Sequence, residues 1–102
     1  MVMSDDAVIV LAMLTFKNGL PREVRDFLPE LVAKTRAEAG CIRYVPHLPS
    51  ENDSKLYFHE EWENATALEK HAASEHLKKF RELAAPHLVD GKSDVTLWRA
   101  IA

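Results

Sequence analysis

The sequence predicts an α+β fold in which the elements follow the order β-α-β-β-α-β. Two observations indicate this order. Hydrophobic residues run together or alternate with a period of two in four segments, and they recur at helical spacing in the two regions that follow the first and third of these segments. Right-handed crossovers turn the order into a four-stranded antiparallel sheet with helices on one face. A chain of 102 residues is expected to form one domain, 1–102, around a single hydrophobic core.

The first strand is expected over Val8–Phe16, because nearly every residue there is apolar. Such a run is typical of a strand that is buried on both faces. Helical spacing follows Pro21, which suits a first helical position, and Gly40 is expected to end this helix. Pro29 lies inside the helix and removes a backbone donor, so we expect a kink near Leu28.

The middle of the chain predicts two strands joined by a polar turn. Cys41–Leu48 alternates as a strand, and its Pro46 favours a sheet edge or a bulge because proline cannot donate to a central ladder. The turn over 49–54 leads into a third strand, Leu56–Trp62. With a period of two, one face of the third strand holds Phe58, Glu60 and Trp62, and the other holds Tyr57, His59 and Glu61.

The second helical region is expected in two parts. Asn64 can cap a first short helix and Ser74 can cap a second one, which ends at Pro86. Residues 89–91 turn the chain, and a fourth strand over 93–101 completes the sheet.

One face of this sheet would lack a cover. The first strand is apolar on both sides, and the third strand carries Phe58 and Trp62 on one side but Tyr57 on the other. Two sheets placed face to face would bury the remaining apolar rows, and two-fold dimers are the commonest soluble assemblies. We therefore expect a homodimer through the open sheet face.

Composition argues against several classes of partner. The net charge of -3 gives no attraction for nucleic acid. The apolar run Ala7–Leu14 is too short to span a bilayer and follows Asp5 and Asp6, so neither a membrane segment nor a leader is expected. A single cysteine, Cys41, with no zinc-type spacing fits a reducing cytoplasm and predicts no metal site.

His71 is the first candidate for chemistry. It shares a helical stripe with Leu68 and Ala72, so it should face the sheet near Glu60 or Trp62. A buried imidazole beside a carboxylate can have a pKa near neutrality, as a general base or a donor to a phenolate requires. The alternative interpretation is a hydrogen-bonded core histidine.

Other candidates surround this pair. Trp62 and Phe58 are either plain core or aromatic walls for a flat substrate, and Tyr44 could place its hydroxyl in the same cavity. His76, in the first turn of the last helix, is either a second polar group or a structural residue. His47, His59 and Glu61 could suggest a metal site, but their spacing carries no ligand signature.

The ordered motifs Gly40-Cys41-x-x-Tyr44, Glu60-x-Trp62, Leu68-x-x-His71 and Ser74-x-His76 resemble the antibiotic biosynthesis monooxygenase domain family, which includes quinol monooxygenases, over nearly the whole chain. The resemblance implies a ferredoxin-like fold paired into a dimeric α/β barrel. It also implies oxygenation of quinols or polycyclic phenols without metal or flavin. Carried onto this sequence, the catalytic pair would be His71, as proton acceptor, and Glu60, which orients it. A small aromatic molecule would be bound by Trp62, Phe58, Tyr44, Phe80 and His76.

Two alternatives to an oxygenase stay open. A related branch isomerises small phosphorylated sugars, and a phosphate would need the cations Arg43, Arg99 and Lys55. A dimeric barrel could also bind an apolar molecule without catalysis. Haem degradation is disfavoured, because the residues of that branch are replaced here by Ala12, His71 and Arg81.

Overall fold

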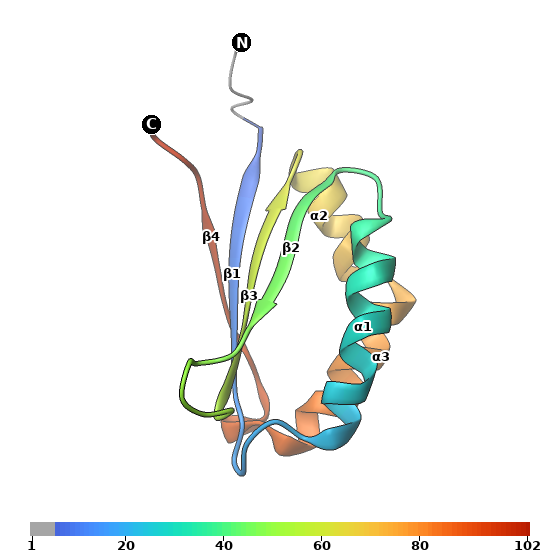
Figure 1. The fold of residues 1–102 in the computed structure, drawn as a ribbon. Coiled ribbons are helices and arrows are strands. Elements are labelled where there is room, and N and C mark those ends of the chain that lie inside the picture. The colour runs from blue at the N-terminus through green and yellow to red at the C-terminus, as the bar shows by residue number, and fades with distance from the viewer. Residues whose placement is uncertain (1–5) are drawn as a thin grey trace.

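The computed structural model describes residues 6–102, so the first five residues of the predicted domain, Asp5 among them, lie outside the described part. The described elements follow the predicted β-α-β-β-α-β order, with the second helical region split in two (Figure 1). They are β1 (Val8–Thr15), α1 (Arg22–Arg36), β2 (Cys41–His47), β3 (Lys55–Trp62), α2 (Ala65–Ala72), α3 (Glu75–Ala84) and β4 (Asp94–Trp98), with the 3-10 turns η1 (Ala85–His87) and η2 (Val89–Gly91) before β4. The predicted ferredoxin-like α+β fold class is confirmed.

The four strands form one antiparallel sheet in the order β2-β3-β1-β4. The helices lie together on one face of it (Figure 1). β2 is an edge strand, as Pro46 predicts, and its register with β3 shifts between Cys41 and Arg43. The fourth strand is shorter than the predicted 93–101 and leaves the sheet after Trp98.

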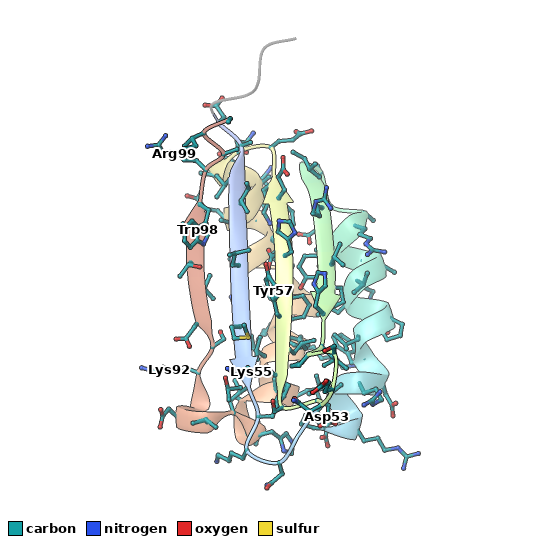
Figure 2. All side chains as sticks on the ribbon, turned by 60° about the vertical axis from the view of Figure 1, so that its left-hand side comes forward. Asp53, Lys55, Tyr57, Lys92, Trp98 and Arg99 are labelled. Atoms are coloured by element: carbon teal, nitrogen blue, oxygen red, sulfur yellow. The ribbon has the colours of Figure 1, made fainter. Side chains whose placement is uncertain are left out.

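The two faces of the sheet differ in burial. The helix-side face is buried and holds Val10, Ala12, Leu14, Leu56, Phe58, Glu60 and Trp62. The prediction for the third strand is thereby confirmed. On β1, the open-face residues Ile9, Leu11 and Met13 are half-buried instead of buried, because no described helix or strand of a single chain covers them. Figure 2 shows this open face, with Tyr57 on β3 and Trp98 on β4.

Both predicted helix caps are present. Asn64 Oδ1 accepts the backbone N–H of Ala67 at 2.9 Å, and Ser74 Oγ accepts that of Leu77 at 3.4 Å. These caps start α2 and α3 in succession. Within residues 6–102, no helix combines the length and the apolarity that crossing a membrane requires.

The first helix differs from expectation at its end. It runs from Arg22 through Pro29 to Arg36 as one helix, so the proline does not interrupt it. Gly40 lies four residues beyond its end, with φ of 85°. A Cβ at Gly40 would lie 2.5 Å from the Ala67 Cβ, so glycine is required both by the backbone conformation and by the close approach of α2.

Candidate functional site

A cavity of about 500 Å³ lies between the helix-side face of the sheet and the helices α2 and α3. Its walls are mostly apolar and come from all four strands and both of these helices. The apolar lining includes Val10, Ala12, Leu14, Phe58, Leu77, Phe80 and Leu88, and the polar lining includes Tyr44, Glu60, His71, Arg81 and Lys92. A mostly apolar cavity with a few polar groups is typical of a small-molecule site.

The cavity reaches solvent along β4. Val95 and Leu97 line it, yet they are 56% and 63% exposed. They pair with Ala12 and Val10 of β1, which are buried. A ligand could therefore enter over the β4 side of the sheet and reach the buried polar groups beyond it.

His71 lies at the inner wall, in the last turn of α2, and only 3% of the residue is exposed. Its Nδ1 lies 2.7 Å from Glu38 Oε2, and its Nε2 lies 4.0 Å from Glu60 Oε1. The Trp62 ring packs against the imidazole, with centroids 4.7 Å apart. The two ring nitrogens therefore face different carboxyl groups.

Burial lowers the pKa of His71 below its usual value, and the hydrogen bond with Glu38 only partly opposes this effect. The imidazole is therefore neutral at neutral pH, with one nitrogen lone pair available. A neutral histidine beside a cavity has the protonation state that a general base needs.

Glu60 is the second buried titratable group of the cavity. The residue is 5% exposed, and Oε1 accepts a hydrogen bond from the Trp62 indole N–H at 3.0 Å. Burial raises the pKa of Glu60 to about 7, against the opposing effect of the Trp62 hydrogen bond. Near neutral pH this carboxyl group therefore populates both its protonated and its ionised form.

Tyr44 completes the polar end of the cavity. Its ring lies 5.1 Å from that of Phe58 and 5.4 Å from that of His71, measured between centroids. Burial, followed by the charge of Glu60, raises the pKa of the Tyr44 hydroxyl far above its usual value, so it remains protonated.

Glu38 was missed by the sequence analysis. It lies in the turn between α1 and β2, and its Oε2 contacts both His71 Nδ1 at 2.7 Å and His76 Nε2 at 3.0 Å. A turn residue has no periodic pattern that would assign it a direction. The available signal is its position two residues before the Gly40-Cys41 motif.

The structure brings most predicted site residues together at this cavity. Tyr44, Phe58, Glu60, His71 and Phe80 all line it. Trp62 packs against the His71 ring and His76 contacts Glu38, and neither of them lines the cavity. The catalytic and binding roles of all seven residues stay predictions.

Two groups of residues bear on metal binding. Glu38, His71 and His76 offer donor atoms within 4.8 Å of one another, a set that could hold a metal ion. Among residues 6–102 this is the group of three such side chains close enough to share an ion, so the alternative set from the sequence, His47, His59 and Glu61, does not converge.

The cations expected for a phosphorylated substrate lie elsewhere. Arg43, Lys55 and Arg99 are exposed and do not line the cavity. Within residues 6–102, its arginine and lysine lining consists of Arg81 and Lys92.

Comparison with known proteins identifies one family and several similar solved structures. The family model described as antibiotic biosynthesis monooxygenase matches residues 7–83. A crystal structure of an antibiotic biosynthesis monooxygenase is 31% identical, with a TM-score of 0.78 over 93% of this chain and 99% of that one. A conserved protein from Methanosarcina mazei Go1 is 29% identical, with a TM-score of 0.82 over 94% of each chain. No curated protein matches the chain.

A more distant structure is the cofactor-independent oxygenase SnoaB from Streptomyces nogalater. It is 16% identical, with a TM-score of 0.76 over 95% of each chain. At this identity the likeness shows a shared fold.

Proposed function

Since the chain belongs to the antibiotic biosynthesis monooxygenase family, we propose that it is a cofactor-independent monooxygenase that oxidises an aromatic quinol or polycyclic phenol with dioxygen. One observation carries the proposal: His71 Nε2 and Glu60 Oε1 lie 4.0 Å apart at the wall of an otherwise apolar cavity. SnoaB, which has the same fold, is described as a cofactor-independent oxygenase, and this supports the proposed chemistry.

The separation of 4.0 Å suits a single substrate oxygen. An oxygen atom at a hydrogen-bond distance of roughly 2.8 Å from each group fits between the two. A phenolic hydroxyl in this position would donate its proton to His71 Nε2. Protonated Glu60 would then donate a hydrogen bond to the phenolate oxygen and stabilise its charge.

The aromatic walls suit the rest of such a substrate. Phe58 and Phe80 meet edge to face, with centroids 5.5 Å apart, and both line the cavity beside Tyr44. A flat ring between these side chains would gain contact energy and would be held at a fixed angle to His71.

The proposed reaction needs no external reductant. His71 removes the phenolic proton, and the electron-rich phenolate passes an electron to dioxygen. Overall, the substrate loses two hydrogen atoms and gains one oxygen atom, while the second oxygen atom leaves as water. The protein therefore binds the ring, moves the proton and excludes water from the intermediate.

We further propose that the protein acts as a homodimer in the cytoplasm. The open sheet face carries Leu11, which pairs with His59 and is half-buried. It also carries the half-buried Tyr57 and Trp98, which is 55% exposed (Figure 2). A second copy laid on this face would cover these apolar side chains and give the dimeric barrel. The lone Cys41 fits a reducing compartment.

Oxygen uptake tests the proposed activity. A panel of quinols and anthrones is supplied in metal-free buffer to the wild type, to His71→Ala and to His87→Ala. His87 is a matched control, because its side chain is 42% exposed, pairs with Glu23 at 3.2 Å and does not line the cavity. We expect His71→Ala to lower the rate about 10²- to 10⁴-fold, and His87→Ala to leave it unchanged.

The same assay separates the alternatives. Uptake that is unaffected by His71→Ala would contradict the assignment of the base. Conversion of a substrate without oxygen consumption would indicate the isomerase instead. Binding of the aromatic panel without conversion would indicate a carrier.

A further inference from the structure

We infer that Glu38 is the positioning residue for the proposed base: it holds the proton of His71 on Nδ1, so that the Nε2 lone pair faces the cavity, and His76 holds Glu38 in place. This inference rests on the role of His71 in the proposed function. It assigns a role to a carboxylate that lies outside the cavity and 33 residues away from His71 in the chain.

The contact between Glu38 and His71 fixes the tautomer. Glu38 Oε2 lies 2.7 Å from His71 Nδ1, a short distance typical of a charge-assisted hydrogen bond. An ionised carboxylate offers only acceptors, so the bond requires a proton on Nδ1. In a neutral imidazole Nε2 is then unprotonated, and Nε2 is the nitrogen that lies 4.0 Å from Glu60.

The arrangement has a known physical use. A carboxylate on the far nitrogen of a histidine keeps the correct tautomer and stabilises the imidazolium that forms when the near nitrogen takes a proton. Glu38 can have both effects, because it contacts Nδ1 from outside the cavity and its side chain is only 18% exposed.

His76 also contacts Glu38. Its Nε2 lies 3.0 Å from the same Oε2 atom, and its side chain is 13% exposed. Ser74 links the two histidines, because its hydroxyl donates to the His71 carbonyl at 2.7 Å and accepts the N–H of Leu77 at the start of α3. The end of α2 and the start of α3 thus hold both imidazoles at one carboxylate oxygen.

The distances favour hydrogen bonds over a metal ion. Ligand atoms about 2.0–2.1 Å from a tetrahedral zinc are roughly 3.3–3.4 Å apart. The two contacts here, 2.7 and 3.0 Å, are shorter than that and lie in the hydrogen-bond range.

The fold of the turn does not depend on the Glu38 side chain, because the backbone of Glu38 makes the hydrogen bonds there. The backbone N–H of Glu38 donates to the Thr35 carbonyl at 3.0 Å, and its own carbonyl accepts the N–H of Cys41 at 3.2 Å. Glu38→Gln should therefore leave the turn folded while it removes the charge and offers His71 an amide that can donate as well as accept.

The experiment combines ¹⁵N NMR of the histidine rings with oxygen-uptake kinetics. The variants are Glu38→Gln, His76→Gln and His76→Leu, and the matched control is Glu69→Gln, an exposed glutamate on α2. The wild type should show His71 protonated on Nδ1 and unprotonated on Nε2. Glu38→Gln should mix the tautomers and lower kcat about 10²- to 10⁴-fold, with KM nearly unchanged and thermal melting retained.

His76 provides a conservative test. His76→Gln keeps a donor for Glu38 and should retain most of the activity and the His71 tautomer, whereas His76→Leu should lower kcat roughly tenfold. Glu69→Gln should change nothing.

Three results would overturn the inference. The first is a wild-type His71 protonated on Nε2, and the second is a Glu38→Gln variant with the wild-type tautomer. The third is a shift of both the His71 and the His76 resonances on adding equimolar Zn²⁺, together with a higher melting temperature, which would assign the cluster to a metal. If the wild type consumes no oxygen, the proposed function fails, while the NMR result still decides the role of Glu38.

Discussion

Trp62 contacts both members of the proposed catalytic pair: its indole N–H donates to Glu60 Oε1 at 3.0 Å, and its ring packs 4.7 Å from the ring of His71. Trp62 is fully buried and does not line the cavity. It therefore fixes the position of Glu60 relative to His71 from behind, without occupying the space a ligand would use.

Glu60 should make stability depend on pH. Its pKa of about 7 exceeds its usual value of 4.5, so the folded protein holds this proton more tightly than the unfolded chain does. The free energy of unfolding should then fall as pH rises between these values, by at most about 3 kcal/mol. In Glu60→Gln this decrease should be absent, as urea unfolding across the window can measure. If the free energy of unfolding changed with pH in the same way in the wild type and in Glu60→Gln, the raised pKa would be contradicted. Glu69→Gln serves as the control.

The pH dependence of kcat/KM should be bell-shaped. The acidic limb reflects protonation of His71, which burial places below its usual pKa, and the alkaline limb reflects ionisation of Glu60 at about 7. Among the described residues, the charged or titratable groups around His71 are Glu38, Tyr44, Glu60, His76 and Arg81. Glu60→Gln should remove the alkaline limb and keep the acidic one. A profile that keeps both limbs in this variant would show that Glu60 is not the acid.

Gly40 should be intolerant of a side chain. Gly40→Ala would place a Cβ 2.5 Å from that of Ala67 at a φ of 85°, so α2, which carries His71, would have to move. We expect a loss of more than about 2 kcal/mol in the free energy of unfolding. Gly91→Ala is the matched control, because φ is 69° there and a Cβ would meet no atom of the described residues within 4 Å. Equal losses in the two variants would show that the contact with α2 is unimportant.

A charge on the open sheet face should disrupt the proposed dimer. Leu11 lies on this face between His59 and Thr96, so Leu11→Glu would place a carboxylate where the second copy is proposed to pack. We expect aggregation or loss of folding in light scattering and thermal melting. Val89→Glu, at a 43% exposed position outside the four strands, is the control and should behave as the wild type. A folded Leu11→Glu monomer with wild-type melting would refute the covering by a second copy.

The sequence predicted the features that depend on periodicity and caps. The alternation of residues predicted that Phe58, Glu60 and Trp62 share one face of β3, and the helical spacing predicted that His71 faces them. Both predictions hold because burial of one face imposes a single register on each element. The caps Asn64 and Ser74 were also readable, because a side-chain acceptor at a helix start satisfies backbone donors locally.

What the sequence did not predict depends on contacts across long separations. Glu38 reaches His71 from a turn that has no period, so no local pattern gives its direction. The sequence pattern predicts that Gly40 ends α1, whereas α1 ends at Arg36. Glycine is needed at position 40 because α2 approaches it closely at Ala67. The exposure of Val95 and Leu97 beside the cavity depends on how far β4 extends.

The most direct test is the absorbance spectrum of an aromatic quinol bound to the protein at neutral pH in the absence of oxygen. If His71 Nε2 removes the phenolic proton, the wild-type complex shows the absorption band of the deprotonated ligand, and the complex with His71→Ala at saturation does not. A wild-type complex that shows only the neutral ligand, or an equal band in both proteins, would contradict the account.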